Sequence, residues 1–187
     1  MFRELLAAEF APYMPLTEDQ LNQLESHYNS LTRWNERLNL TRIRDLSESV
    51  RFHYCESLFL AQLLPPGPLR IVDVGSGAGF PGIPVAILRP ESYVTLVESH
   101  QRKAVFLREV SRDLQNVRVM AKRAENIAER FDWTISRAVL PSDVLDLKLS
   151  RDVALLIGVE DAGQLMGHAE AVPWGNNRIM FHVEHST

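Results

Sequence analysis

The sequence has one cysteine, no long hydrophobic run and no surplus of basic residues. A single thiol, Cys55, excludes an internal disulfide and is typical of proteins from a reducing compartment. No apolar stretch reaches the roughly 18 residues that a membrane-spanning helix needs, so we expect no membrane partner. The first residues include Glu4 and Glu9 and lack a basic-then-apolar leader. The chain is therefore expected to be cytoplasmic.

Metal ligands are also scarce. The six histidines are scattered and form no cluster with cysteine or acidic residues, so we expect no bound metal. The formal net charge of −4 disfavours a nucleic-acid partner when the chain is taken as a whole. The charge is uneven, however, because residues 100–123 contain seven Lys or Arg and only two acidic residues. A basic face can therefore coexist with the acidic total.

The chain divides at Pro65-Pro66-Gly67-Pro68, which is typical of a linker. A length of 187 residues suits one domain with a modest extension, and we expect a monomer. Residues 1–64 are predicted to be a helical extension, and residues 69–187 an α/β domain. In the extension, Thr17 begins a capping box with Gln20, and Ser47 is predicted to cap a second helix.

After the linker, strand patterns alternate with helix patterns. Strands are predicted at 69–74, 93–97, 117–121, 131–136 and 153–157, and 178–183 reads as a last edge strand. Helices are predicted at 82–89, 100–114, 123–129, 141–147 and 160–168. This alternation predicts a doubly wound parallel sheet with helices on both faces. Ligands of such sheets bind at the carboxyl ends of the strands.

The most informative segment is a glycine-rich turn. The apolar run Ile71-Val72-Asp73-Val74 predicts a buried strand. Glycines follow at every second position from Gly75 to Gly79, and Pro81 is predicted to open the next helix. Glycine permits positive φ and lets a ligand approach the backbone closely. This strand, turn and helix therefore predict a nucleotide-binding corner.

Two cofactor types fit the turn. Gly77, Gly79 and Gly82 satisfy the dinucleotide pattern G-x-G-x-x-G. Asp73, Gly75, Gly77 and Gly79 satisfy D-x-G-x-G-x-G, which resembles motif I of class I S-adenosylmethionine (SAM) methyltransferases. Asp73 favours SAM over NAD(P), because dinucleotide sites usually have an apolar residue there. Glu98, at the end of the next strand, can accept hydrogen bonds from ribose in either cofactor.

The end of the strand predicted at 131–136 is informative by what it lacks. Ser136-Arg137-Ala138 contains neither the Asn/Asp-Pro-Pro-aromatic motif of base amino-methylating enzymes nor a Pro-Cys nucleophile. We interpret Cys55 as a buried small apolar residue. An acceptor with a free lone pair, such as guanine N7, needs no general base. Methyl transfer would then depend on positioning and electrostatics.

Several segments together resemble one family. They are Trp34-Asn35-Glu36-Arg37-Leu38-Asn39-Leu40-Thr41, His53 with Glu56-Ser57-Leu58, residues 73–84, Lys103 with Phe106-Leu107, Arg123-Ala124-Glu125 and Ser136-Arg137-Ala138. This set is similar to the bacterial small-subunit rRNA guanine-N7 methyltransferases, the RsmG or GidB family, over residues 33–139. The resemblance implies a class I SAM-dependent methyltransferase fold and N7 methylation of a guanine in the decoding-region loop of 16S rRNA.

The resemblance also implies partners and residues. The partner would be 16S rRNA or the 30S subunit, and the cofactor S-adenosyl-L-methionine. The candidate cofactor-binding residues are Gly75, Gly77, Gly79, Phe80, Glu98, Ala124, Glu125 and Arg137. The candidates on the substrate side are Asn39, His53, Ser57 and Arg137, with packing as the alternative role of the first three. The candidate RNA contacts are Arg42, Arg44, Arg102, Lys103, Arg108 and Arg123.

Alternatives remain at this point. The protein could methylate a small molecule, or it could be a dinucleotide-binding regulatory module. Arg137 could instead be a structural ion-pair partner of Glu125 or Asp73. Family members usually have a Lys-Gly pair at the end of a later strand, whereas this chain has Ile157-Gly158 there.

Overall fold

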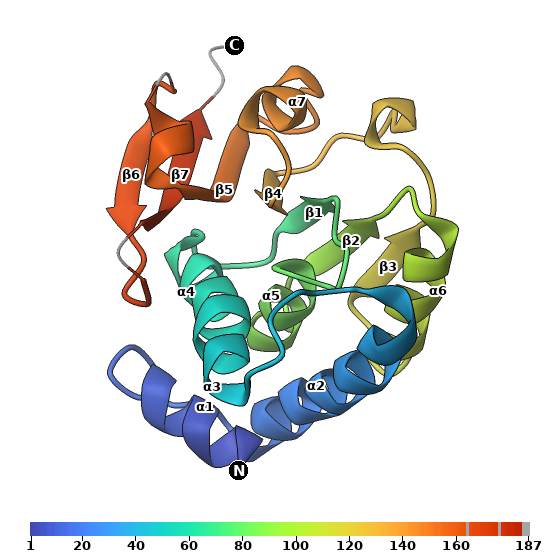
Figure 1. Ribbon diagram of the computed structural model, residues 1–187. Coiled ribbons are helices and arrows are strands. Elements are labelled where there is room, and N and C mark those ends of the chain that lie inside the picture. Colours follow the sequence, from blue (N-terminus) through green and yellow to red (C-terminus); the bar gives the residue numbers. More distant parts are fainter. Residues whose placement is uncertain (164, 176, 185–187) are drawn as a thin grey trace.

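The computed structural model describes residues 1–163, 165–175 and 177–184, and it centres on a seven-stranded sheet (Figure 1). The strand order is β3-β2-β1-β4-β5-β7-β6. β7 is antiparallel to both of its neighbours, while the pairs among β1 to β5 are parallel. The strands are β1 (Arg70–Val74), β2 (Tyr93–Val97), β3 (Val117–Met120), β4 (Trp133–Arg137), β5 (Asp152–Gly158), β6 (His168–Ala171) and β7 (Arg178–Glu184).

Helices cover one face of the sheet with a single continuous core. They are α1 (Phe2–Phe10), α2 (Glu18–Leu38), α3 (Leu46–Ser49), the π-helical turn η1 (Val50–Cys55), α4 (Glu56–Leu63), α5 (Gly82–Leu88) and α6 (Gln101–Val110). Alternate strand residues such as Ile71 and Ala154 point into this core, together with Phe10 and Leu58. The helices that precede β1 therefore share their core with the sheet.

The other face is covered by short elements. They are α7 (Pro141–Asp146) and the 3-10 turns η2 (Ala124–Asn126) and η3 (Val159–Ala162). Val72 and Val74 point to this face and pack with Ile127 and Phe131. Further along the sheet, β5 and β7 pack against Val144 of α7. Short segments thus bury this face through individual side chains.

The sheet confirms the predicted α/β class, and all six strands predicted from the sequence are present within a residue or two of their expected bounds. The predicted place of 178–183 at the edge is wrong, because β7 pairs with β5 and β6 and leaves β6 at the edge. The capping box of Thr17 and Gln20 is present at the start of α2. Cys55 is buried, as predicted.

Several predicted helices differ from the structure. The helix predicted at 123–129 is only the turn η2, and in place of the helix predicted at 160–168 the structure has the turn η3 and the start of β6. The side chain that caps α3 belongs to Asp45 rather than Ser47. Pro81 precedes α5, which begins at Gly82. Among the described helices, none combines the length and apolar character of a membrane span.

Candidate active site

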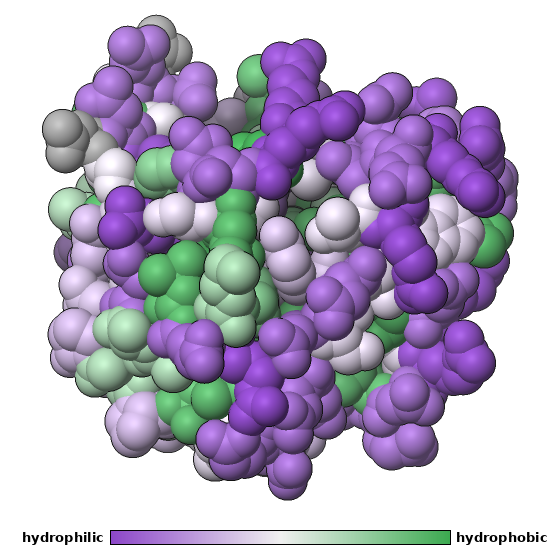
Figure 2. Space-filling model, turned by 60° about the horizontal axis from the view of Figure 1, so that its bottom comes forward, coloured by the Kyte–Doolittle hydropathy of each residue, from purple (hydrophilic) through white to green (hydrophobic). Residues whose placement is uncertain are grey.

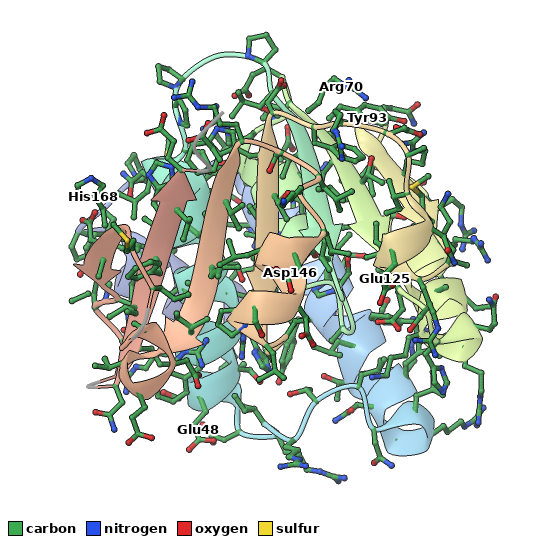
Figure 3. The ribbon with its side chains drawn as sticks, turned by 90° about the horizontal axis from the view of Figure 1, so that it is seen from above. Glu48, Arg70, Tyr93, Glu125, Asp146 and His168 are labelled. Atoms are coloured by element: carbon green, nitrogen blue, oxygen red, sulfur yellow. The ribbon has the colours of Figure 1, made fainter. Side chains whose placement is uncertain are left out.

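The glycine loop joins β1 to α5 at the carboxyl ends of the parallel strands. Gly75, Gly77 and Gly79 have φ values of +72°, +55° and +91°, which residues with a Cβ adopt only with strain. In Figure 3, Arg70 and Tyr93 mark the starts of β1 and β2, and Glu125 lies toward the opposite end of the strands. The glycine loop therefore shapes the edge of the sheet where α/β proteins bind ligands.

Two adjoining cavities lie along this edge. The first, of about 230 Å³, lies between the ends of β1 and β2, the turn η2 and α7. The second, of about 420 Å³, lies between the glycine loop, the segment 40–43, η1 and the end of β4. We call the first the η2 pocket and the second the loop pocket. Gly75 and Glu98 line both pockets, so the two are halves of one site.

Glu98 holds the junction of the two pockets in place. One carboxylate oxygen accepts a hydrogen bond from the backbone N–H of Gly77 at 3.0 Å, and the other accepts one from that of His100 at 2.7 Å. Glu98 is 7% exposed. A carboxylate fixed by two backbone donors presents its remaining lone pairs in a defined direction. This is the geometry that recognition of vicinal hydroxyl groups requires.

Asp73 orders the glycine loop from beneath. It is fully buried, and its Oδ2 accepts a hydrogen bond from the N–H of Gly82 at 3.0 Å. Burial raises the pKa of Asp73 to about 7. This carboxyl group occupies the first free donor of α5, where a pyrophosphate would otherwise sit. The arrangement disfavours a dinucleotide and fits a cofactor without phosphates.

Arg137 lines the loop pocket beside an aromatic ring. Its guanidinium carbon lies 6.0 Å from the ring centre of Phe80, and its Nη1 is buried without a hydrogen-bond partner among the described residues. Burial lowers the pKa of Arg137 to about 10, and nearby Glu56 opposes that effect. The predicted alternative of an ion pair with Glu125 or Asp73 is wrong, because no such pair is present within the described ranges. The guanidinium keeps a free donor beside the cavity.

Glu56 is the buried carboxylate behind Arg137. It is completely buried in α4 and forms an ion pair with Nε of Arg178 at 2.8 Å. Burial raises the pKa of Glu56, while Arg178 and Arg137 oppose that rise. Arg178 lies in β7, at the far end of the sequence from α4. The C-terminal strand therefore supplies a charge partner behind the loop pocket.

Two buried histidines hold the ring of Phe80. His53 stacks on it with ring centres 4.6 Å apart, and His27 meets it edge-on at 5.2 Å. His27 Nε2 lies 3.0 Å from the carbonyl oxygen of Ala78 and Nδ1 lies 2.8 Å from the hydroxyl of Tyr54. Since a carbonyl only accepts, Nε2 carries the proton and Nδ1 accepts from Tyr54. Burial lowers the pKa of His27 to about 4 and that of His53 to about 2, so both rings are neutral.

The outer wall of the loop pocket is fastened to α2. The side-chain amide of Asn35 donates to the carbonyl of Thr41 at 2.9 Å and accepts from its N–H, also at 2.9 Å. The hydroxyl of Thr41 shares a hydrogen bond of 2.7 Å with Nε2 of His53. Asn39, with φ of +47°, ends α2 in the left-handed region and turns the chain into this wall. The contacts Asn35–Thr41–His53–Phe80 thus connect the wall to the glycine loop.

The candidate residues fall into three groups. Gly75, Gly77, Phe80, Glu98, Ala124, Glu125 and Arg137 line one or both pockets, as do His53, Arg42, Lys103 and Arg123. Gly79 shapes the loop, Asn39 ends α2, and Ser57 donates to the carbonyl of His53 inside the helix at 2.6 Å, so these three act on the backbone. Arg44, Arg102 and Arg108 line neither pocket. We therefore do not find all six basic candidates at one place.

Sequence reasoning missed several lining residues. Thr41 and Ile43 line the loop pocket, and Val139, Asp143 and Leu147 line the η2 pocket. The family resemblance already included Thr41, but nothing local marks the other four. Within residues 1–163, 165–175 and 177–184, no three His, Cys, Asp or Glu side chains converge to form a metal site.

The strand order, the glycine loop and the paired pockets define a class I methyltransferase fold. Solved structures show the same fold. A SAM-dependent methyltransferase from Aquifex aeolicus aligns with a TM-score of 0.58 and 15% identity, over 77% of this chain and 95% of that one. The magnesium protoporphyrin IX methyltransferase of Synechocystis aligns with a TM-score of 0.57 and 13% identity, over 91% and 99%.

The sequence comparisons are more specific than the fold. The profile of the family described as rRNA small subunit methyltransferase G matches residues 20–154, and the chain belongs to that family. The member from Chloroflexus aggregans is 42% identical over 151 residues, covering 76% of this chain and 63% of the relative. The member from Roseiflexus castenholzii is 41% identical over 144 residues, covering 73% and 62%. This chain thus spans less than two thirds of the length of these relatives.

Proposed function

We propose that this protein transfers the methyl group of SAM to N7 of a guanine in small-subunit ribosomal RNA. The observation that carries the proposal is the pair of pockets that meet at Gly75 and Glu98 in a member of the methyltransferase G family. One pocket suits the nucleoside part of the cofactor. The other suits its methionine part and the acceptor base.

The cofactor fits the residues at the junction. Glu98 would accept from the ribose hydroxyls, and Ala124 and Glu125 of the η2 pocket would hold adenine. The glycines would present bare backbone to the cofactor. There is no room for a side chain at Gly75, because a Cβ there would lie 2.7 Å from Cγ2 of Val139. Glu98, which lines both pockets, would give the site a negative character that suits a sulfonium cation. SAM supplies an electrophilic methyl group there.

The chain's own residues need move no proton in this reaction. The lone pair of N7 would form the new C–N bond as the S–C bond breaks, with the positive charge leaving sulfur for the guanine ring, so no side chain would have to remove a proton. His53 is neutral, and its Nε2 shares a hydrogen bond with the hydroxyl of Thr41. It would therefore hold the pocket wall in position rather than act as a base. Arg137 would orient the base, because its side chain lines the loop pocket and its Nη1 has no hydrogen-bond partner among the described residues, which would leave a donor for the O6 acceptor beside N7.

Basic residues would guide the RNA to this opening. Arg42 and Lys103 line the loop pocket itself, and Arg123 lines the η2 pocket. Arg44 lies along the same 41–44 segment and is exposed. Phosphate contacts from these side chains would position the nucleic acid without reading its sequence. Arg102 and Arg108 lie on α6, beside this opening rather than in it.

The test is methyl transfer from labelled SAM to 16S rRNA and to 30S particles from a strain that lacks this gene. We expect one labelled guanine in the decoding-region loop, mapped by cleavage at N7-methylguanine. SAM binding without transfer to either RNA would contradict the RNA substrate and support a small-molecule acceptor. Thermal protection by NADH and not by SAM would contradict methyl transfer altogether.

A matched pair of variants strengthens this test. Arg137→Gln should lower the rate of transfer at saturating SAM at least tenfold, because it removes the donor beside the acceptor. Tyr93→Phe changes an exposed residue, 45% accessible, at the opposite end of the sheet and should leave the rate unchanged. Equal rates for both variants would exclude Arg137 from the reaction.

A further inference from the structure

A third hollow lies beside the loop pocket and has a different composition. It is a groove of about 480 Å³ between the last turns of α2 and one side of α6. Its lining consists of Arg33, Trp34, Glu36, Arg37, Leu38, Arg102 and Glu109. α2 and α6 pack side by side on the right of Figure 1. We call this hollow the α2–α6 groove.

The groove is continuous in sequence with the loop pocket on both of its sides. On α6, Arg102 lines the groove and the next residue, Lys103, lines the loop pocket. On the other side, Leu38 ends α2 in the groove, and Leu40 lines the loop pocket two residues later. An RNA strand that enters the loop pocket would therefore have the groove beside it.

The charged groups of the groove are available to a ligand. Arg33, Arg37 and Arg102 are exposed, and none of them forms an ion pair with the described part of the chain. Arg33 has one neutral contact, a donation to the hydroxyl of Ser30 at 3.3 Å. Figure 2 shows hydrophilic side chains over the right-hand part of the face that the N-terminal helices form. Three exposed guanidinium groups without an acidic partner provide donors for phosphate oxygens.

Trp34 adds a surface for a base. Its indole is half-buried, and its Nε1–H donates to Oε1 of Glu109 at 3.0 Å. That bond occupies one of the two carboxylates in the groove and fixes the ring. Glu36 is exposed and can accept a hydrogen bond from the amino group of a base. An aromatic ring beside arginines is the combination that binds single-stranded nucleotides.

We propose that the α2–α6 groove binds a nucleotide next to the methylated guanine, with its base on Trp34 and its phosphates on Arg37 and Arg102. The proposal rests on the proposed function, since it assumes an RNA acceptor. It assigns to Arg33, Trp34 and Arg37 a role in RNA binding that the sequence did not indicate. It also separates Arg102 from Arg108, which lies on the same helix but does not line the groove.

The test compares two double variants that remove the same charge. Arg37→Ala/Arg102→Ala removes two groove arginines, and Arg108→Ala/Arg112→Ala removes two exposed arginines from α6 and the turn after it. The ligand is a hairpin with the decoding-region sequence of 16S rRNA, titrated from 50 to 300 mM salt. The groove variant should lower the slope of log affinity against log salt by about 1.4, because each single-strand phosphate contact contributes about 0.7. The control should keep the wild-type slope.

Tryptophan fluorescence gives an independent readout. Trp133 and Trp174 are 8% and 7% exposed, so Trp34 is the tryptophan that RNA can reach. Binding of the hairpin should quench the emission, and Trp34→Phe should remove the quench. On 30S particles, the groove variant should raise KM about tenfold and change kcat less than twofold.

Each outcome separates the groove from the proposed function. If the control variant loses as much slope as the groove variant, or if RNA binds without quenching Trp34, the groove is not the site. If the protein transfers no methyl group to RNA, the proposed function fails, and the hairpin titration still decides the groove. If the hairpin does not bind at all, the groove proposal is overturned, and methyl transfer to 16S rRNA and to 30S particles still decides the proposed function.

Discussion

The two faces of the sheet differ in how they are covered and in what the cover does. One face lies beneath α1, α2, α4, α5 and α6, and buried side chains from these helices reach into the loops of the site. The other lies beneath the six-residue helix α7 and two 3-10 turns. The long helices hold the glycine loop and the pocket wall, whereas the short elements leave room for the η2 pocket.

Buried polar groups show the same difference. On the helical face, His27, Asn35, His53, Glu56 and Asp73 are all less than 9% exposed, and each contacts a backbone or side chain near the loop pocket. On the other face, the buried polar contacts lie between neighbouring strands and turns, such as that of Thr134 with Ser150 at 2.6 Å. Changes on the helical face should therefore affect both stability and the site.

The largest expected effect on stability comes from replacing a glycine by alanine on the helical face, compared with the same change at a glycine on the other face. A Cβ at Gly82 would lie 2.3 Å from Cδ2 of Leu96 and 2.5 Å from Oδ2 of Asp73. At Gly163, which lies just after η3, the nearest atom is a carbonyl oxygen at 3.7 Å. Gly82→Ala should lower the free energy of unfolding by about 3 kcal/mol, and Gly163→Ala should change it by less than about 0.5 kcal/mol. Urea unfolding measures both, and equal midpoints would contradict the contrast.

The next effect concerns ion pairs. Arg178→Gln leaves the fully buried Glu56 without its partner, and should cost about 2 kcal/mol because a buried charge loses its compensation. Arg151→Gln breaks the pair with Glu184, in which both side chains are more than half exposed, and should cost almost nothing. Thermal unfolding at pH 7.5 compares them. Because burial raises the pKa of Glu56 and Arg178 opposes that rise, the Arg178→Gln variant should recover stability as the pH falls and Glu56 gains a proton; a flat pH profile would count against this explanation.

The third effect is a pH dependence that originates in His27. Burial lowers its pKa from 6.5 to about 4, so the folded state prefers the neutral ring. Stability from this group is complete above pH 6.5 and falls as the pH drops toward 4. Between pH 7 and pH 5 the loss should be about 2 kcal/mol. His27→Gln should reduce that loss, whereas replacing the exposed His100 with Gln should not; denaturant unfolding at both pH values distinguishes the two variants.

Much of this architecture could be predicted from local sequence. The strands were predictable because β-branched apolar runs such as Ile71–Val74 are short and lie between turn residues. Residues 1–64 were predicted to be a helical extension, but no individual helix was placed at α1, although Phe2, Leu6 and Phe10 repeat at helical spacing and are all buried. That pattern could have revealed it.

The short cover of the second face could not be predicted locally. Residues 123–129 have helical character, yet Ile127 is extended, with ψ of 119°, because Ile127 and Phe131 both pack against the sheet. At Gly167 the backbone passes so close to β7 that a Cβ would lie 2.2 Å from the carbonyl oxygen of His182. Tertiary contacts, rather than the local sequence, determine the backbone conformation of both segments.

The site was predictable in its ligand-facing residues and not in its supports. Gly75 and Glu98 directly follow strands and Arg137 is the last residue of one, so the sheet sets their positions. By contrast, His27 contacts Ala78, which lies 51 residues further along the chain. Nothing near His27 in the sequence indicates that contact, because only the packing of α2 against the glycine loop creates it.

Apart from the controls, the substitution expected to change stability least, Asn35→Ala, should have the most specific effect on function. Asn35→Ala removes both hydrogen bonds to Thr41 and should lower the free energy of unfolding by about 1 kcal/mol. Thr32→Ala removes a hydroxyl that bonds only the carbonyl of Tyr28 in its own helix, and should have little effect. If the pocket wall positions the acceptor, Asn35→Ala raises KM for 30S particles while affinity for SAM stays unchanged, since Asn35 lines neither pocket. Loss of SAM affinity together with acceptor affinity would show that the contacts from Asn35 to Phe80 act as one unit, and the helical face would then support both halves of the site rather than the wall alone.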